Sequence, residues 1–379
     1  MRRFVSLVYG FGLLGLFAIS LCGCFKKELI SPNHYKDSTI VAGIDSPGYV
    51  NGVGTAARFD HPFGLALDQS GNIYVADQAN SVIRTISQAA VVNTLAGTPG
   101  VTGALNGAAT LASFNKPFGV AVDGSGNVYV ADAGNNLIRK IAVNGTVSNF
   151  AGTGLAGAAD GKDSASFNSP LGVAVDGSGN VYVADYGNDE IRKITPAGLV
   201  STLAGEAGLA GNADGLDTAA RFNLPESLVV DGNGNIFVAD NGNNEVRKVT
   251  TAGLVSTIAG NGSTGKINGN GTAASFNSPF GIAIDGAGNL YVADSGNNLI
   301  REISLAGQVS TFAGSGAKGS ADAGALQATF NTPAGIVVDA SGNVYVSDEN
   351  NNIIRKIGPG GLVSTIAVRS TPNLLRPRK

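Results

Sequence analysis

The sequence repeats one motif six times at a nearly constant spacing. In its second copy the motif reads Asp-Gly-Ser-Gly-Asn-Val-Tyr-Val-Ala-Asp, over residues 123–132. Its first aspartate recurs at intervals of 55, 53, 55, 54 and 54 residues, at Asp68, Asp123, Asp176, Asp231, Asp285 and Asp339. So regular a period predicts a repeat architecture, in which each unit is one supersecondary structure packed on its neighbours.

Four short runs of apolar and β-branched residues make up each unit. In the second unit they span residues 117–123, 128–131, 137–141 and 147–151. The segments between them are rich in Gly and Asn, which tolerate the positive φ angles of tight turns. Each unit is therefore expected to fold as a four-stranded antiparallel sheet.

One such sheet cannot bury both of its faces alone, but six sheets arranged radially can cover one another. The runs are continuously apolar rather than alternating, which is typical of strands packed on both faces. We predict an all-β fold, a six-bladed β-propeller of four-stranded antiparallel blades. A β-sandwich or β-solenoid is the alternative. It fits less well because solenoid periods are shorter and sandwiches do not repeat internally.

The repeated unit has a recognisable consensus. It runs Pro-x-Gly-[Val/Leu/Ile]-Ala-[Val/Ile/Leu]-Asp, then Gly-Asn-[Val/Ile/Leu]-[Tyr/Phe]-Val-[Ala/Ser]-Asp, then Asn-x-[Ile/Val]-Arg. This pattern resembles the NHL repeat and covers about residues 39–367. The resemblance implies a propeller platform. Members of that family bind partners, including RNA and protein, or occasionally catalyse reactions, so the resemblance leaves the activity open.

The first residues are typical of an exported protein. Residues 1–23 combine a basic start, an apolar run and a small-residue end, as a signal peptide does. Leu21-Cys22-Gly23-Cys24 also looks like a bacterial lipobox, which predicts cleavage before Cys24 and lipidation of its sulfur. An uncleaved membrane anchor is the alternative. Both cysteines of the chain lie here, so no disulfide framework or Cys-based metal site is expected further on.

The predicted domains follow from this start. Residues 24–38 are expected to form a lipidated tether, residues 39–367 the propeller, and residues 368–379 a basic C-terminal tail. Phe25 rather than Asp follows Cys24, which favours a bacterial cell-envelope protein anchored in the outer membrane, on its periplasmic or surface side. Residues 39–43 resemble the fourth strands of later units. We expect them to close the ring in the last blade, as a fifth strand or in place of residues 363–367.

Composition argues against a nucleic-acid partner. Only 14% of the residues are charged, and loss of Arg2 and Arg3 with the signal would move the net charge from −3 to −5. A nucleic-acid binder needs a basic stripe to neutralise phosphates.

An Asp stands seven residues before an Arg in every unit. A pair present in all six blades is expected to be structural, either as a ring of ion pairs or as turn-capping hydrogen bonds. The pairs are Asp77 and Arg84, Asp132 and Arg139, Asp185 and Arg192, Asp240 and Arg247, Asp294 and Arg301, and Asp348 and Arg355. A Phe in each long loop, such as Phe167, is expected to fill the seam between blades.

The family resemblance leaves an enzyme open, because six-bladed relatives include lactonases, strictosidine-synthase-like proteins and a zinc lyase. A zinc lyase needs several His ligands, and this chain has only His34 and His61. The positions that hold calcium in lactonase-like enzymes are apolar here, namely Ala66, Ala121, Ala174, Val229, Ala283 and Val337. We identify no Ser–His pair, phosphate loop or carboxylate dyad. No catalytic residue, metal site or cofactor is therefore predicted.

Function is expected where the six copies differ. The residue after the turn Asp varies from blade to blade, and Glu226 and Ser227 replace an apolar residue and Gly in blade four. We predict a ligand face on the side of the long loops, centred near blades three and four. Neutral drift of surface positions is the alternative. The candidate residues are Glu226, Ser227, Tyr186, Asp189, Glu190, Asn241, Glu245 and Glu349.

The sequence thus favours a non-enzymatic propeller lipoprotein that acts as a binding or scaffold module for a protein or glycan partner in the cell envelope, with the membrane reached through the lipid anchor. A divergent lactonase-like or lyase-type enzyme is the first alternative. A structural part of an envelope complex is the second.

Overall fold

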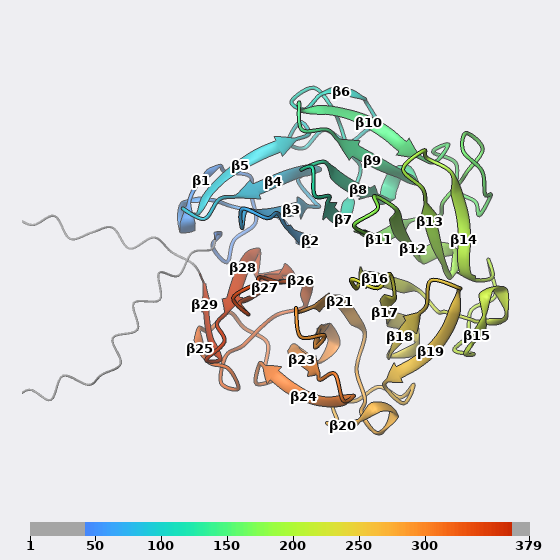
Figure 1. Ribbon diagram of the computed structural model, residues 1–379. Coiled ribbons are helices and arrows are strands. Elements are labelled where there is room, and N and C mark those ends of the chain that lie inside the picture. Colours follow the sequence, from blue (N-terminus) through green and yellow to red (C-terminus); the bar gives the residue numbers. More distant parts are fainter. Residues whose placement is uncertain (1–41, 366–379) are drawn as a thin grey trace, which may run out of the picture. The chain divides into compact units, whose positions relative to one another are not determined.

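The chain folds as the predicted six-bladed β-propeller (Figure 1). The computed structural model describes residues 42–365. The predicted signal peptide, Cys24, the tether and the basic tail lie outside the described residues. Within residues 42–365 no helix is long and apolar enough to cross a membrane.

Each blade contains four antiparallel strands, which follow one another in sequence order from the propeller axis outward. The innermost strands are β2 (Pro62–Leu67), β7 (Pro117–Val122), β11 (Pro170–Val175), β16 (Pro225–Val230), β21 (Pro279–Ile284) and β26 (Pro333–Val338). The second strands are β3 (Ile73–Asp77), β8 (Val128–Asp132), β12 (Val181–Asp185), β17 (Ile236–Asp240), β22 (Leu290–Asp294) and β27 (Val344–Asp348).

The two outer positions repeat in the same way. The third strands are β4 (Val82–Ile86), β9 (Leu137–Ile141), β13 (Glu190–Ile194), β18 (Glu245–Val249), β23 (Leu299–Ile303) and β28 (Ile353–Ile357). The fourth strands are β5 (Val91–Ala96), β10 (Thr146–Ala151), β14 (Val200–Gly205), β19 (Leu254–Ala259), β24 (Gln308–Ala313) and β29 (Leu362–Thr365).

The long loop before each blade adds an outer edge that the sequence did not predict. In five blades a two-residue strand of this loop pairs with the fourth strand. These strands are β1 (Gly52–Val53), β6 (Gly107–Ala108), β15 (Gly215–Leu216), β20 (Gly269–Asn270) and β25 (Ala323–Gly324). In blade three a single bridge between Gly161 and Val200 takes this place. The loop therefore covers the outer edge of a blade before it enters the innermost strand.

Short 3-10 turns occupy two recurring places. Three lie in the long loops, namely η1 (Gly54–Ala56), η4 (Asp217–Ala219) and η6 (Gly271–Ala273). Five connect the second strand to the third, namely η2 (Ala133–Asn135), η3 (Tyr186–Asn188), η5 (Asn241–Asn243), η7 (Ser295–Asn297) and η8 (Glu349–Asn351). The turns of the second group and the ends of the long loops share one face of the propeller, which we call the mouth face.

The hairpins on the opposite face are capped by the repeated aspartate. Asp123 Oδ1 accepts hydrogen bonds from the backbone N–H groups of Ser125 and Asn127, both at 2.9 Å. Its Oδ2 accepts a hydrogen bond from the Asn127 side chain at 2.8 Å. These contacts satisfy the backbone groups of the tight turn.

The ring closes where the two ends of the described chain meet in blade six. β29 pairs with β28 from Ile357 to Arg355. The next residue of β28, Ile354, donates its backbone N–H to the carbonyl of Ala42 at 3.2 Å. In blade one the equivalent partner is Ala96 of the same blade's fourth strand. Ala42 therefore takes the fourth-strand place beyond β29. It neither adds a fifth strand nor displaces residues 363–365, which stay paired with β28, and residues 39–41 lie outside the described residues.

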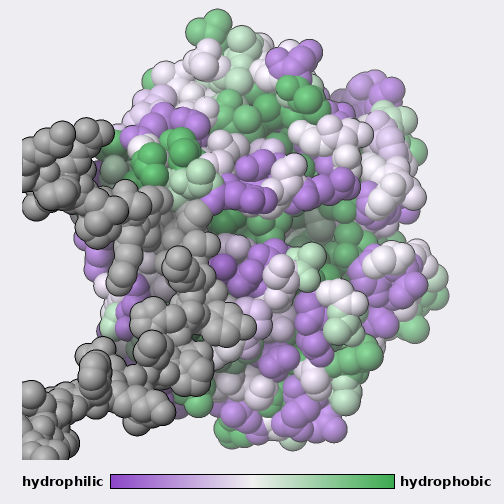
Figure 2. Space-filling view, turned by 60° about the vertical axis from the view of Figure 1, so that its left-hand side comes forward, coloured by the Kyte–Doolittle hydropathy of each residue, from purple (hydrophilic) through white to green (hydrophobic). Residues whose placement is uncertain are grey.

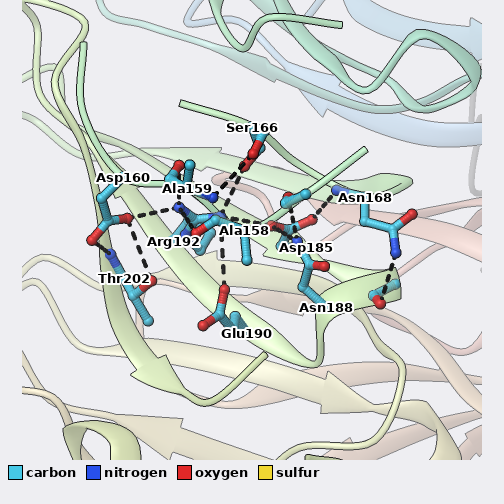
Figure 3. Close-up of polar contacts among 12 residues, drawn as sticks. Ala158, Ala159, Asp160, Ser166, Asn168, Asp185, Asn188, Glu190, Arg192 and Thr202 are labelled. Carbon is cyan, nitrogen blue, oxygen red and sulfur yellow. Dashed lines mark hydrogen bonds and ion pairs between the residues drawn. The ribbon is translucent and has the colours of Figure 1, made fainter. Parts of the chain in front are cut away.

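A buried ion pair between neighbouring strands fastens each blade to its long loop. In all six blades the Arg Nη1 lies 2.7–2.9 Å from the Asp Oδ2, and both side chains are fully buried. Arg139 also donates to the loop carbonyls of Ser113 at 3.1 Å and Leu105 at 2.9 Å. Its guanidinium packs 5.2 Å from the centroid of the Phe114 ring. Figure 3 shows the equivalent network around Arg192.

The loop phenylalanines fill the seams between blades, as the sequence predicts. All six are fully buried, namely Phe59, Phe114, Phe167, Phe222, Phe276 and Phe330. Phe167, for example, packs with Val173 and Val183 of its own blade and with Ala131 and Ile138 of the blade before it. Each ring thus holds two blades together and also forms the apolar wall beside the buried Arg.

Removing one partner of the ion pair should destabilise the propeller strongly. Arg139→Met leaves the Asp132 carboxylate buried without its cation, a change that typically costs about 3–5 kcal/mol. We expect this loss in the free energy of unfolding measured with urea. The double variant Asp132→Asn/Arg139→Met should lose less, because no unpaired charge remains.

Ser148→Ala, at an exposed position of β10 in the same blade, is the matched control and should change stability by less than about 0.5 kcal/mol. An Arg139→Met protein as stable as this control would contradict a structural role for the pair.

Candidate functional site

The six innermost strands enclose a central cavity of about 270 Å³. Its wall is formed by the residues from Phe63 to Leu67 in blade one and by their equivalents in the other blades. Nearly all of these side chains are apolar. Glu226 is the only titratable residue among them, and Ser227 is the only other residue with a polar side chain. On the surface seen in Figure 2, apolar residues line a hollow with hydrophilic edges.

Blade four departs from the others because Ser227 stands where the other blades have Gly. At that point the inner strands approach so closely that a Cβ on Gly64 would fall 2.3 Å from the carbonyl oxygen of Phe118. A Cβ on Gly335 would fall 2.1 Å from the carbonyl oxygen of Phe63. Ser227 brings a Cβ, and it pairs directly with Ala239 of β17, whereas the other ladders skip this position. The inner strand of blade four is therefore rearranged at this point.

Glu226 is buried at the mouth end of this strand without a hydrogen-bond partner. The residue is 6% exposed. No hydrogen bond to its carboxyl group is found among residues 42–365, and its oxygens are not among the fully buried atoms that lack a partner, so the group faces the cavity. Burial raises the pKa of Glu226 well above its usual value, and the charge of Glu349 raises it further. A carboxyl group placed in this way is costly when ionised, because transfer of a charge from water is offset only by a partner.

The turns of three blades place polar groups around Glu226. Tyr186 begins η3, and burial together with the charges of Glu226 and Asp189 raises its pKa. Glu349 begins η8 in blade six, and burial raises the pKa of its carboxyl group. Asn241 begins η5, and its Nδ2 is buried with no partner among the described residues. These three side chains form a polar rim above Glu226.

Aromatic rings narrow the channel at the same end. The Phe63 ring lies 4.4 Å from the Phe118 ring of the neighbouring blade, measured between centroids. It also lies 5.8 Å from the Phe280 ring of blade five. Since blades one and five are not adjacent in the ring (Figure 1), these rings reach across the channel axis. We call Glu226, Tyr186, Asn241, Glu349 and the three rings the channel mouth.

Other predicted candidates do not reach the channel mouth. Asp189 Oδ1 accepts the backbone N–H of Leu224 in the next blade at 2.7 Å. Asn136 makes the equivalent bond to Ser169 at 2.8 Å, so Asp189 takes part in a repeated tie between blades.

The two acidic residues at the start of the third strands also lie away from the channel mouth. Glu190 and Glu245 are buried beside the long loops, 3.7 Å from Arg192 and 3.9 Å from Arg247 respectively. Figure 3 shows Glu190 in this position next to Arg192. Four of the eight candidate residues thus lie together at the channel mouth, namely Glu226, Tyr186, Asn241 and Glu349. Ser227 follows Glu226 in β16.

His61 is a further polar residue near the channel mouth that the sequence reasoning left as an ordinary loop residue. Its Nδ1 lies 2.7 Å from Asp60 Oδ1, and its backbone N–H donates to Asn352 Oδ1 of blade six. The positive charge of protonated His61 lowers the pKa of Glu349, against the effect of burial. The signal that could have located it is its position directly before Pro62, the first residue of an innermost strand. Among the residues described, no three His, Cys, Asp or Glu side chains cluster as metal ligands would.

Comparisons with known proteins place this geometry in a family. The NHL repeat matches residues 114–141, 167–194, 222–249, 276–303 and 330–357, so the first blade is a blade by its fold and lies outside the matched repeats. NHL repeat-containing protein 2 of Bos taurus is 37% identical over 373 residues, which are 88% of this chain and 49% of that protein. SUPPRESSOR OF QUENCHING 1, a chloroplastic protein of Arabidopsis thaliana, is 30% identical over 276 residues, 68% of this chain and 26% of that protein. The chain therefore spans about a quarter to a half of these relatives.

Solved structures share the fold at low sequence identity. An auxiliary nutrient binding protein from Bacteroides ovatus superposes with a TM-score of 0.64 at 17% identity, over 86% of this chain and 75% of that one. The virginiamycin B lyase of Staphylococcus aureus gives a TM-score of 0.52 at 14% identity, over 82% and 85% of the two chains. At these identities the similarity concerns the fold alone.

The pH dependence of the unfolding free energy should show whether the Glu226 carboxyl group is protonated. The folded chain holds the Glu226 proton more tightly than the unfolded chain, so this favourable contribution is fully present below pH about 4.5 and is lost as pH rises through the raised pKa. Glu226→Gln keeps a neutral group of similar shape. We therefore expect its advantage in unfolding free energy over the unmodified protein to grow as pH increases.

Urea unfolding of both proteins at several values between pH 4.5 and pH 9 measures this difference. The other groups that face Glu226, namely Glu349 and Tyr186, titrate in both proteins. Asp163→Asn, at an exposed loop carboxylate, is the control and should give no such trend. A gap that stays constant with pH would show that Glu226 has an ordinary carboxyl environment.

Proposed function

Because this chain belongs to the NHL-repeat family and folds as a six-bladed propeller, we propose that it is a non-enzymatic binding module of the bacterial cell envelope. In this proposal the lipid on Cys24 anchors the protein in the outer membrane, and the partner docks on the mouth face. The observation that carries the proposal is the channel mouth, where blade-specific polar residues surround a buried carboxyl group without a partner.

The uniform scaffold supports this location. The buried Asp and Arg side chains are the same in every blade and bind one another. Four of the residues that differ between blades, Glu226, Tyr186, Asn241 and Glu349, lie at the channel mouth, where Glu226 and Ser227 also break the regular inner strand. A solved protein of similar fold is described as an auxiliary nutrient binding protein, which agrees with a binding role for such a propeller.

We take the partner to be a protein. The lining of the channel carries a carboxyl group and no Lys or Arg, and a basic side chain of a protein would compensate that charge. A neutral glycan would not, so glycan binding is treated as an outcome of the test below.

A divergent enzyme of the lyase or lactonase-like type is the second candidate. The observation in its favour is the His61–Asp60 pair at 2.7 Å near the acidic channel mouth, because a His oriented by a carboxylate can act as a general base. A His61→Ala protein that keeps full partner binding would separate this candidate from the binding function.

Substitutions at the channel mouth should weaken partner binding selectively. Crosslinking of the full-length lipidated protein in its own envelope, followed by mass spectrometry, identifies the partner, and its affinity is then measured with purified proteins. We expect Tyr186→Ala and Glu226→Gln each to weaken binding at least tenfold, because both remove groups of the proposed contact.

Asn233→Ala is the matched control, because Asn233 is exposed in the blade-four hairpin on the opposite face. It should leave the affinity within twofold. Equal affinities for all three variants would place the binding surface elsewhere, and capture of an envelope glycan instead of a protein would overturn the choice of partner.

The anchor is tested separately. Cys24→Ala should abolish incorporation of labelled palmitate and move the protein from the membrane fraction to the soluble fraction. A Cys24→Ala protein that stays in the membrane fraction would contradict lipid anchoring and would favour an uncleaved signal segment.

A further inference from the structure

We propose that the channel mouth is a binding site for an organic cation, either a guanidinium or a primary ammonium group. This inference rests on the proposed function, because it names the chemical group that the mouth face recognises.

The first argument is an unmatched charge. Other buried carboxylates of the described chain have a donor or a cation beside them. Asp185 lies 2.8 Å from Arg192, and Asp189 accepts the backbone N–H of Leu224 at 2.7 Å. Glu190 and Glu245 each have a buried Oε2 without a hydrogen bond, but they lie 3.7 and 3.9 Å from an Arg nitrogen. Glu226 is equally buried, and its only charged neighbour with a marked effect is a second carboxyl group, that of Glu349. No positive charge among the described residues therefore balances the carboxyl group of Glu226.

The channel mouth has the same two kinds of group that contact the buried arginines, a carboxyl group and aromatic rings. In each blade a guanidinium lies between a carboxylate and a Phe ring, as Arg139 lies 2.8 Å from Asp132 and 5.2 Å from the Phe114 centroid. The channel mouth offers a carboxyl group, Glu226, at the inner-strand position that Phe63, Phe118 and Phe280 occupy in their own blades, where these rings cluster. Such rings attract cations through their negative faces. The channel mouth therefore holds a carboxyl group and aromatic rings that can bind a guanidinium, and we expect the ligand to supply that guanidinium.

The third argument concerns size and hardness. A cavity of about 270 Å³ has room for a single side chain or a small amine and lies below the usual range for drug-sized ligands, about 300–1,000 Å³. Hard metal cations prefer six or more oxygen ligands, whereas one carboxyl group and aromatic rings suit a soft organic cation. The buried amide of Asn241 supplies a further polar group at the rim.

Titration calorimetry with matched probes tests the proposal on the full-length protein. Butylguanidinium carries the proposed group, and butylurea is its neutral isostere. We expect butylguanidinium to bind at least tenfold more tightly than butylurea. Glu226→Gln should lose this preference, and Asn233→Ala should keep it. The binding enthalpy should also depend on the ionisation enthalpy of the buffer, because the cation displaces a proton from Glu226 to the buffer. Glu349 and Tyr186 are the other titratable groups that face Glu226.

Equal binding of the charged and neutral probes, or an unchanged preference in Glu226→Gln, would overturn the proposal. Glu226→Gln is expected to be at least as stable as the unmodified protein, so misfolding does not confuse the result. If the identified partner binds through the mouth face while butylguanidinium shows no preference, this inference fails and the binding function stands.

A second pair of probes distinguishes the source of the cation. A capped Gly-Arg-Gly peptide and its citrulline counterpart present the same two groups within a chain. Tighter binding of the Arg peptide than of butylguanidinium assigns the site to a protein side chain. Binding of butylguanidinium alone assigns it to a free small cation.

Discussion

The buried pair of Asp and Arg is the interaction on which the rest of this propeller depends. In every blade one guanidinium joins the second strand, the third strand, a Phe ring and the carbonyls of the long loop. That loop carries the chain from one blade to the next, so the same contact fixes both a blade and its connection. Burial raises the pKa of Asp77, Asp185 and Asp348 to about 6 against the effect of the Arg. Burial raises the pKa of Asp240 further, to about 7. The hydrogen bonds and the charge of the Arg offset part of this cost of desolvation.

A scaffold held together in this uniform way leaves the centre of the ring free to vary. The innermost strands of neighbouring blades have Gly where they approach closely, and blade four has Ser227 at that position. The same strand places Glu226 in an apolar wall, with no hydrogen-bond partner among residues 42–365. A buried carboxyl group without a cation lowers stability at neutral pH, and such a cost is typical of a site arranged for a ligand. The proposed function thus rests on one departure from the repeat.

The repeat made most of the fold predictable, because its turns and strands depend on local chemistry. The regular Asp-x-x-Gly-Asn hairpins and the recurrence of Asp77 and Arg84 in every unit were enough for the blades and their ion pairs. The edge strands, such as Gly107–Ala108, gave no signal because they are only two residues long and lie inside Gly-rich loops. For the site, Glu226 and Tyr186 could be located from their differences between blades. Glu190 and Glu245 could not be excluded, because packing against Arg192 and Arg247 turns them away from the channel. His61 lies directly before Pro62 in the sequence, but this position indicates the rim only once Pro62 is known to begin an innermost strand.

The most direct test of this account is the titration of the Glu226 carboxyl group itself. Carbon-13 labelling of glutamate gives seven side-chain signals, one for each Glu of the chain, and the signal absent from Glu226→Gln identifies Glu226. The account predicts that Glu226 releases its proton well above the usual pH for a glutamate and that saturation with butylguanidinium moves this transition to lower pH. A titration of Glu226 near pH 4.5 that butylguanidinium does not shift would contradict the claim that this carboxyl group binds a positively charged ligand.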